Sequence, residues 1–259
     1  MTGLRQLAVR LGPSALLLGA GVVAWQAYAV QGDVGDDVLP PPTRVVSAGW
    51  ADRQALWDSF GPTLREVVLG FALSIAFAFA VSVVLDRSAF ARRAVIPVLI
   101  GSQTLPIIIL APLVVIWFGF GLTPKVLLVA LVTFFPLVIG LVEGYASSEP
   151  DAVTLLETMG AGWLTTFRLV RLPSALPSFF TSLRISITYA VVAAIFAEYA
   201  GAEAGLGVYM QGAKGSFRTD LVLAAVLVST ALTLVLYALT FVVQRMMIPW
   251  YTASRKGPV

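Results

Sequence analysis

Six long apolar runs dominate the chain, and their lengths constrain its fold more than any other feature of the sequence. A helix rises about 1.5 Å per residue, so about twenty residues cross the hydrocarbon core of a bilayer, which is about 30 Å thick. We therefore expect an all-α integral membrane protein with about six transmembrane helices. The expected spans are residues 11–30, 67–85, 95–118, 125–145, 179–199 and 221–246.

The composition excludes most soluble and enzymatic classes. The chain of 259 residues is 58% hydrophobic and 12% charged, with a mean hydropathy of +0.89, unlike a soluble domain. It contains no Cys, which excludes disulfides and thiol chemistry, and no His, the commonest general base and metal ligand. No pair of buried carboxylates is evident, which further disfavours an intramembrane enzyme. We expect no catalytic residue and no metal site.

The N-terminal part of the chain has two expected segments. Residues 1–30 are expected to form a transmembrane helix, although the basic start and Ala27-Tyr28-Ala29 also fit a cleavable signal peptide. Residues 31–60 are expected to form an extracytoplasmic loop. Within it, residues 43–60 form a candidate interfacial amphipathic helix with two aromatics suited to the headgroup zone, Trp50 and Trp57.

The remaining chain has a membrane core at residues 61–250 and a tail at 251–259. The run at 95–118 contains three prolines, which remove backbone donors and predict a kinked helix: Pro97, Pro106 and Pro112. Gly140 and Gly144 form a GxxxG pattern, which is typical of close helix packing in membranes.

The distribution of Lys and Arg predicts the orientation. With the N-terminus in the cytoplasm, eleven of these residues fall on the cytoplasmic side and six, Lys125 among them, on the other. Cytoplasmic loops carry the excess of positive charge in membrane proteins. This places both termini and the polar segment 149–184 in the cytoplasm.

That polar segment has an ordered internal pattern. Val153, Leu156 and Gly160 would share one face of a short helix, with polar residues largely on the other. Gly160 and Gly162 would end that helix and let the backbone turn. A basic amphipathic run follows. Taken alone, this pattern is also consistent with an interfacial helical hairpin that joins two membrane spans.

The spacing in this segment resembles the cytoplasmic loop of permease subunits of bacterial ATP-binding-cassette (ABC) importers. The family pattern is Glu-Ala-Ala, three residues, Gly, nine residues, Ile, one residue, Leu-Pro. Here Gly160 is followed by nine residues and then by Val170-Arg171-Leu172-Pro173, whereas Thr154-Leu155-Leu156 replaces Glu-Ala-Ala and Glu157 lies one helical turn away. The resemblance implies a type I importer permease fold with a coupling loop at 149–176. The residues it assigns to ATPase coupling are Thr154, Leu155, Leu156, Glu157, Gly160, Ala161, Val170, Leu172 and Pro173.

The resemblance extends over roughly residues 60–250. Within the family, the sequence is most similar to the branch that contains nitrate, sulfonate, taurine and thiamine-pyrimidine-precursor permeases. Segments 207–210, 216–220 and 248–250 look most like the subgroup for hydroxymethylpyrimidine-like precursors. The resemblance implies an inner-membrane homodimer, two cytoplasmic ABC ATPase subunits and a solute-binding protein. It implies lipid contact and no nucleic acid. A sulfonate, taurine or nitrate importer is the alternative.

The chain has no GxxxxGK[ST] phosphate-binding loop, so ATP would be bound and hydrolysed by the partner subunit, and we expect no cofactor on this chain. A stand-alone channel or secondary transporter is less favoured, because no inverted repeat is evident and the core spans carry almost no charge.

Polar residues at membrane depth are the candidates for a translocation pathway, because such groups are costly in lipid without a reason. Ser and Thr hydroxyls can instead bond to their own helix backbone or join helices. The core offers no Lys or Arg at mid-depth, which favours a neutral solute over an anion. The pathway candidates are Ser102, Gln103, Thr104, Tyr189 and Glu198.

Overall fold

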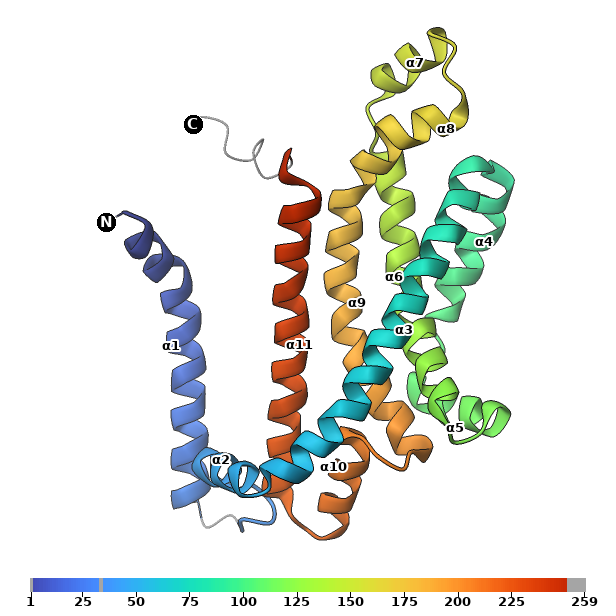
Figure 1. The fold of residues 1–259 in the computed structure, drawn as a ribbon. Helices are drawn as coiled ribbons and strands as arrows, with labels where there is room; N and C mark the ends of the chain where they lie inside the picture. The colour runs from blue at the N-terminus through green and yellow to red at the C-terminus, as the bar shows by residue number, and fades with distance from the viewer. Residues whose placement is uncertain (1, 33–34, 251–259) are drawn as a thin grey trace. The chain divides into compact units, whose positions relative to one another are not determined.

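A computed structural model describes residues 2–32 and 35–250, and nearly all of them are helical (Figure 1). The predicted all-α class is confirmed, whereas the predicted tail at 251–259 lies outside the described residues. In chain order the helices are α1 (Thr2–Gln31), α2 (Pro42–Ala51), α3 (Arg53–Arg87), α4 (Ala89–Ser102), α5 (Ile107–Phe118), α6 (Leu122–Ala146), α7 (Pro150–Thr158), α8 (Trp163–Thr166), the π-helix η1 (Phe167–Arg171), α9 (Leu172–Gly201), α10 (Leu206–Gly215) and α11 (Thr219–Met247).

Five segments of the described residues are long and apolar enough to cross a membrane. A sixth crossing is available if α4 and α5 count together as one broken span. The predicted number of about six is therefore consistent with the structure. The five segments are Gly12–Gln31, Arg53–Arg87, Leu122–Ala146, Trp163–Gly201 and Thr219–Met247.

The run at 95–118 is bent far more sharply than a kinked helix. Its two halves, α4 and α5, meet at 100° across a break of a few residues. Pro106 lies immediately before α5 in extended conformation and disfavours a helical conformation at the preceding residue. With 14 and 12 residues, the halves are about 21 and 18 Å long at 1.5 Å per residue, so neither crosses a bilayer alone.

The single interfacial helix predicted at 43–60 is two helices in the structure. Asp52, with φ −100° and ψ 21°, separates α2 from α3. Its carboxylate accepts a hydrogen bond of 2.6 Å from the Tyr209 hydroxyl. Burial, together with the bond to Asp52, raises the pKa of Tyr209 above its ordinary value, so the hydroxyl stays protonated and able to donate. Trp50 and Trp57 are largely exposed, as their expected place in the headgroup zone requires.

The chain forms two compact units, and the first contains Met1–Ser59 and Tyr209–Val228. Polar contacts join its two segments. The Thr219 hydroxyl donates to the backbone oxygen of Asp37, and Arg44 lies 3.8 Å from Asp220. These contacts tie residues before α3 to the start of α11 within this unit.

The second unit contains Phe60–Val208 and Ser229–Val259, and its centre is the close packing of α6 against α9. Gly140 and Gly144 lie on the contacting face of α6. A Cβ atom built on Gly144 would lie 2.6 Å from the Cα atom of Ala175, and one on Gly140 would collide with Ser182. The GxxxG pattern therefore predicted a real packing contact. Residues of α3 and η1 complete the apolar core around this pair, including Leu85 and Phe167.

The order of the helices gives the second unit two distinct ends. The segment α7–α8–η1 connects the end of α6 to the start of α9, so it lies at what we call the loop end (Figure 1). The start of α6 and the end of α9 lie at the opposite end. There Thr63 of α3 contacts Glu198 of α9, so α3 runs from the opposite end at residue 63 to the loop end at residue 87.

The α6–α9 contact predicts a position-specific response to added methyl groups. Gly144→Ala should destabilise the protein by about 1–3 kcal/mol, because the new methyl group meets the backbone of α9. Gly61→Ala is the matched control, since no atom lies within 4 Å of the added Cβ and helix propensity should give a gain of about 0.5–1 kcal/mol. Thermal unfolding of the purified protein in detergent measures both. Equal stability of the two variants would contradict the packing.

Candidate functional site

The first half of the loop is an isolated, exposed helix. None of the residues of α7 is buried, and the Thr154 hydroxyl donates to its own helix at the backbone oxygen of Pro150. Val153 and Leu156 are less exposed than Thr154 and Glu157, as the predicted amphipathic pattern requires. Two apolar side chains nevertheless face outward at its C-terminal half, Leu155 and Met159. An exposed helix with exposed apolar residues is a surface suited to a partner.

Gly160 ends this helix in a specific geometry. The Ala161 N–H donates to the oxygen of Leu156, and the Gly160 N–H donates to the oxygen of Glu157. This pair of bonds is the Schellman motif, which requires a left-handed residue at the position of Gly160. Gly160 has φ +80°, a conformation that costs little only for glycine. The predicted helix end at Gly160 is confirmed.

The second half of the loop is anchored. Gly162 precedes α8 in extended conformation, Val170 lies in η1, and Leu172 and Pro173 begin α9. The Phe167 side chain is buried in the core of the second unit. The loop therefore consists of a free helix and an anchored segment separated by the turn at Gly160.

A cavity of about 440 Å³ brings together three of the predicted pathway residues, Ser102, Gln103 and Tyr189. They come from the α4–α5 break and from α9. None of the residues lining it is charged; the others are Leu105, Ile107, Leu110, Leu131, Val132 and Val192. The Ser102 hydroxyl donates to the backbone oxygen of Leu99, which leaves the amide of Gln103 and the hydroxyl of Tyr189 as its main polar groups.

The structure does not bring the other two pathway candidates to this cavity. The Thr104 hydroxyl bonds to the backbone oxygen of Gly101, and Thr104 does not line the cavity. Glu198 is 1% exposed and accepts hydrogen bonds from the Thr63 hydroxyl and the Gly207 N–H. A Cβ atom at Gly205, where φ is +136°, would collide with its carboxylate. Glu198 therefore holds together the turn between α9 and α10.

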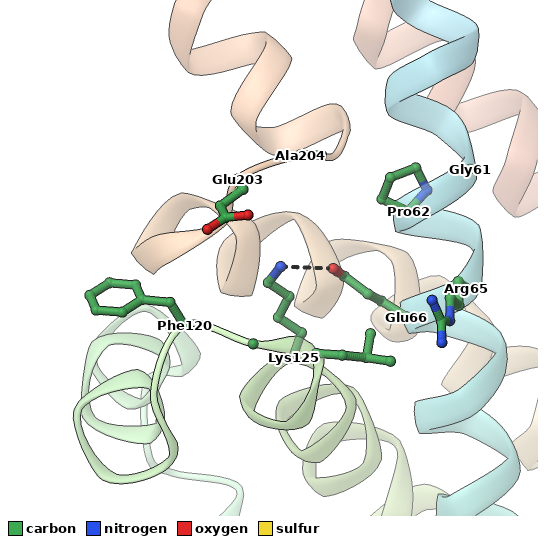
Figure 2. Close-up of a pocket in the computed structure, with 10 residues that line it drawn as sticks. Gly61, Pro62, Arg65, Glu66, Phe120, Lys125, Glu203 and Ala204 are labelled. Atoms are coloured by element: carbon green, nitrogen blue, oxygen red, sulfur yellow. Dashed lines mark ion pairs between the residues drawn. The ribbon is translucent and has the colours of Figure 1, made fainter.

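The core spans were expected to carry almost no charge, but the structure buries an ion pair near Glu198 at the start of two of them. Lys125 Nζ of α6 lies 3.2 Å from Glu66 Oε1 of α3, and both side chains are at least nine-tenths buried. The two residues line a pocket of about 560 Å³ at the opposite end from the loop. Figure 2 shows their side chains meeting among the other lining residues. The other residues that line the pocket are Gly61, Pro62, Arg65, Phe120, Gly121, Leu122, Glu203 and Ala204.

The positions of Glu66 and Lys125 relative to the apolar runs could have predicted this pair. Glu66 directly precedes the run at 67–85, and Lys125 begins the run at 125–145. The predicted orientation starts both runs on the same side of the membrane. Opposite charges at equal depth on two neighbouring spans favour pairing, because each is costly alone in lipid.

The sequence matches the model of the family described as "Binding-protein-dependent transport system inner membrane component" over residues 67–252. It is 34% identical to the formylaminopyrimidine transport permease protein ThiX of Halalkalibacterium halodurans, over 82% of this chain and 86% of that protein. It is 29% identical to the taurine transport system permease protein TauC of Escherichia coli, over 95% of this chain and 91% of that protein. A solved structure of an amino acid ABC transporter with histidines has a TM-score of 0.64 and 14% identity, over 77% of this chain and 97% of that one, and it supports the predicted fold alone.

The buried pair predicts an asymmetry between single and double variants. Lys125→Met should destabilise the protein by about 3–5 kcal/mol, because it leaves the Glu66 carboxylate buried without its cation. Adding Glu66→Gln should recover much of that loss, since the uncompensated charge is then removed. Lys214→Met, at an exposed position of α10, is the control for loss of a lysine. Thermal unfolding in detergent is the measurement, and a double variant no more stable than Lys125→Met would exclude the pairing.

Proposed function

The chain belongs to the inner membrane component family of binding-protein-dependent transport systems and is an ABC importer permease subunit, and on this premise we propose how it works. Two copies form one pathway as a homodimer, two cytoplasmic ATPase subunits bind to their loops, and a solute-binding protein delivers the solute to the other face. The observation that carries the proposal is the loop itself, with its free helix α7, its Schellman turn at Gly160 and its anchored second half.

The free helix α7 is the part of the chain that contacts the ATPase. It exposes Leu155 and Met159 beside Glu157, which is a combination of apolar surface and charge suited to a groove. Because the loop joins α6 directly to α9, closure of the ATPase pair would move these two helices together. The Gly160 turn sets the angle at which α7 projects.

The orientation follows from the charge distribution. The loop end lies in the cytoplasm with both termini, and the opposite end, with the pocket of Figure 2, faces outward. Cytoplasmic placement of the loop is required if it binds a cytoplasmic ATPase. The chain lacks a phosphate-binding loop, so ATP hydrolysis belongs to the partner subunit.

The solute is a small neutral heterocycle, most like a thiamine pyrimidine precursor. The uncharged cavity with Gln103 and Tyr189 supports this choice, because an amide and a phenol can pair with ring nitrogens and amino groups. The 34% identity to a protein named for formylaminopyrimidine transport also supports it. The alternative is a sulfonate such as taurine, favoured by the 29% identity over nearly the whole chain to a taurine permease.

Replacing Gly160 should weaken the complex with the ATPase. Gly160→Val places a branched residue in the left-handed region at a cost of about 1–2 kcal/mol, which lowers the population of the native turn by roughly 5–30-fold. We expect co-purification with the ATPase and solute uptake to fall together. Gly162→Ala is the matched control, because Gly162 has φ −71° and open space around it. Normal uptake by Gly160→Val would show that the turn has no role in coupling.

Single cysteines test the orientation cleanly, because the chain has none of its own. A cysteine at position 161 in intact cells should be protected from a membrane-impermeant thiol reagent, whereas one at position 35 should react. Permeabilised cells should label at both positions, which controls for burial. Labelling at position 161 from outside would reverse the proposed topology.

Competition for uptake separates the two solute classes. Cells that depend on this importer should take up labelled hydroxymethylpyrimidine, and excess unlabelled precursor should abolish the uptake while taurine or nitrate leaves it unchanged. A negative charge is costly in an uncharged passage without a compensating cation. Growth on a sulfonate as sole sulfur source that depends on this chain, with precursor uptake unaffected by its loss, would favour the alternative.

A further inference from the structure

The anchored half of the loop is joined to the end of α3 by a charged contact. Arg171, the last residue of η1, donates a hydrogen bond of 2.8 Å from its guanidinium to Oδ1 of Asp86. The Asp86 side chain is 7% exposed and that of Arg171 27%. The two residues are 85 positions apart in the chain, and the pair connects the last turn of α3 to the point where the loop becomes α9.

Aromatic contacts reinforce the same junction. The guanidinium of Arg87 lies 5.2 Å from the centre of the Trp163 ring, which stacks on Phe167 at 5.0 Å. Phe167 in turn contacts Tyr145 at the end of α6, with ring centres 5.3 Å apart. The Tyr145 hydroxyl lies 3.2 Å from that of Ser82, one turn before Asp86 on α3. The end of α3 therefore touches both the loop and α6.

The junction also has polar groups without a partner. In the part of the chain that the structure describes, three buried atoms there make no hydrogen bond: Asp86 Oδ2, Trp163 Nε1 and Thr166 Oγ1. A permanent brace would be expected to satisfy its buried polar atoms. Unpaired donors and an unpaired acceptor within one junction leave room for a second arrangement in which they are paired. The π-helical turn in η1 is a further irregularity of the kind found at functional positions.

Helix α3 extends from this junction to the pocket at the opposite end of the second unit. From Asp86 back to Gly61 is about 25 residues, or about 37 Å of helix at 1.5 Å per residue. Gly61 and Glu66 line the pocket at the opposite end of the second unit, where Glu66 pairs with Lys125 (Figure 2). A single helix therefore connects the loop junction to the outer pocket.

We propose that the Asp86–Arg171 ion pair is the joint that passes movement of the loop to α3, which carries it to the outer pocket. Asp86 and Arg171 are positioning residues for transport, and the proposal rests on the function given above. Apolar contacts alone would let the loop slide over α3, because they have no preferred direction. A hydrogen-bonded ion pair fixes one point of contact, so that α3 must follow the start of α9.

The test follows the outer end of α3 while the ATPase at the inner end is switched. Gly61→Cys introduces the only cysteine at a position where a Cβ meets nothing within 4 Å. The permease is reconstituted in liposomes with its ATPase and solute-binding protein, and thiol labelling is timed with and without ATP and vanadate. We expect vanadate trapping to change the labelling rate by about tenfold, within the range usual for coupled sites.

Asp86→Asn or Arg171→Gln, added to this background, should reduce that change to less than about twofold, while ATPase binding and basal hydrolysis persist. The exchange Asp86→Arg with Arg171→Asp should restore it. Arg92→Gln is the matched control, since Arg92 is an exposed arginine of α4 close in sequence to Asp86.

The outcomes are distinguishable. If labelling at position 61 ignores ATP with Asp86 and Arg171 intact while ATP still drives solute uptake, movement does not reach the outer pocket through α3 and the joint is overturned; if ATP drives no uptake either, the proposed function itself fails. If the full change survives in Asp86→Asn and Arg171→Gln, the joint is overturned and the importer assignment stands. If both variants fail to accumulate or lose the ATPase, the pair is a brace of the fold, and the joint is again overturned.

Discussion

The close contact between α6 and α9 is the interaction on which the rest of the second unit depends. Apolar side chains gain little by leaving lipid for each other, so membrane helices associate through small residues that let backbones approach. Gly140 and Gly144 supply this contact. The loop connects one end of the pair, the uncharged cavity lies along it, and Lys125 and Glu198 belong to its other end. Each of these features keeps its geometry only while the two helices remain in contact.

Buried polar groups give the packed helices a fixed register. Glu66 and Lys125 are expensive to bury singly, and Glu198 is surrounded by donors from Thr63 and Gly207. These contacts tie α3, α6 and the α9–α10 turn at one end. The Asp86–Arg171 pair ties α3 to the loop at the other end. A chain that is otherwise apolar thus places its few buried charges where helices must keep their alignment.

The features that the sequence predicted well depend on local chemistry. Gly160 ends α7 because its left-handed conformation is favourable for glycine, and the GxxxG pattern packs because its glycines share a face. The features that it missed depend on distant contacts. The break at Asp52 has its partner at Tyr209, the Glu66–Lys125 pair joins separate spans, and the 100° bend at the α4–α5 break exceeds the kink that its prolines predict. The placement of Thr104 and Glu198 away from the cavity depends likewise on how the helices pack.

ATP hydrolysis in the complete importer is the most direct measurement of whether this chain works as a permease subunit. The permease is purified with its ATPase, reconstituted in liposomes, and supplied with solute-binding protein in the presence and absence of pyrimidine precursor. We expect the ATPase to stay bound to the permease and solute-loaded binding protein to raise both ATP hydrolysis and solute uptake. Solute uptake by the permease alone, at the same rate without the ATPase or ATP, would contradict this expectation and would instead identify a stand-alone transporter.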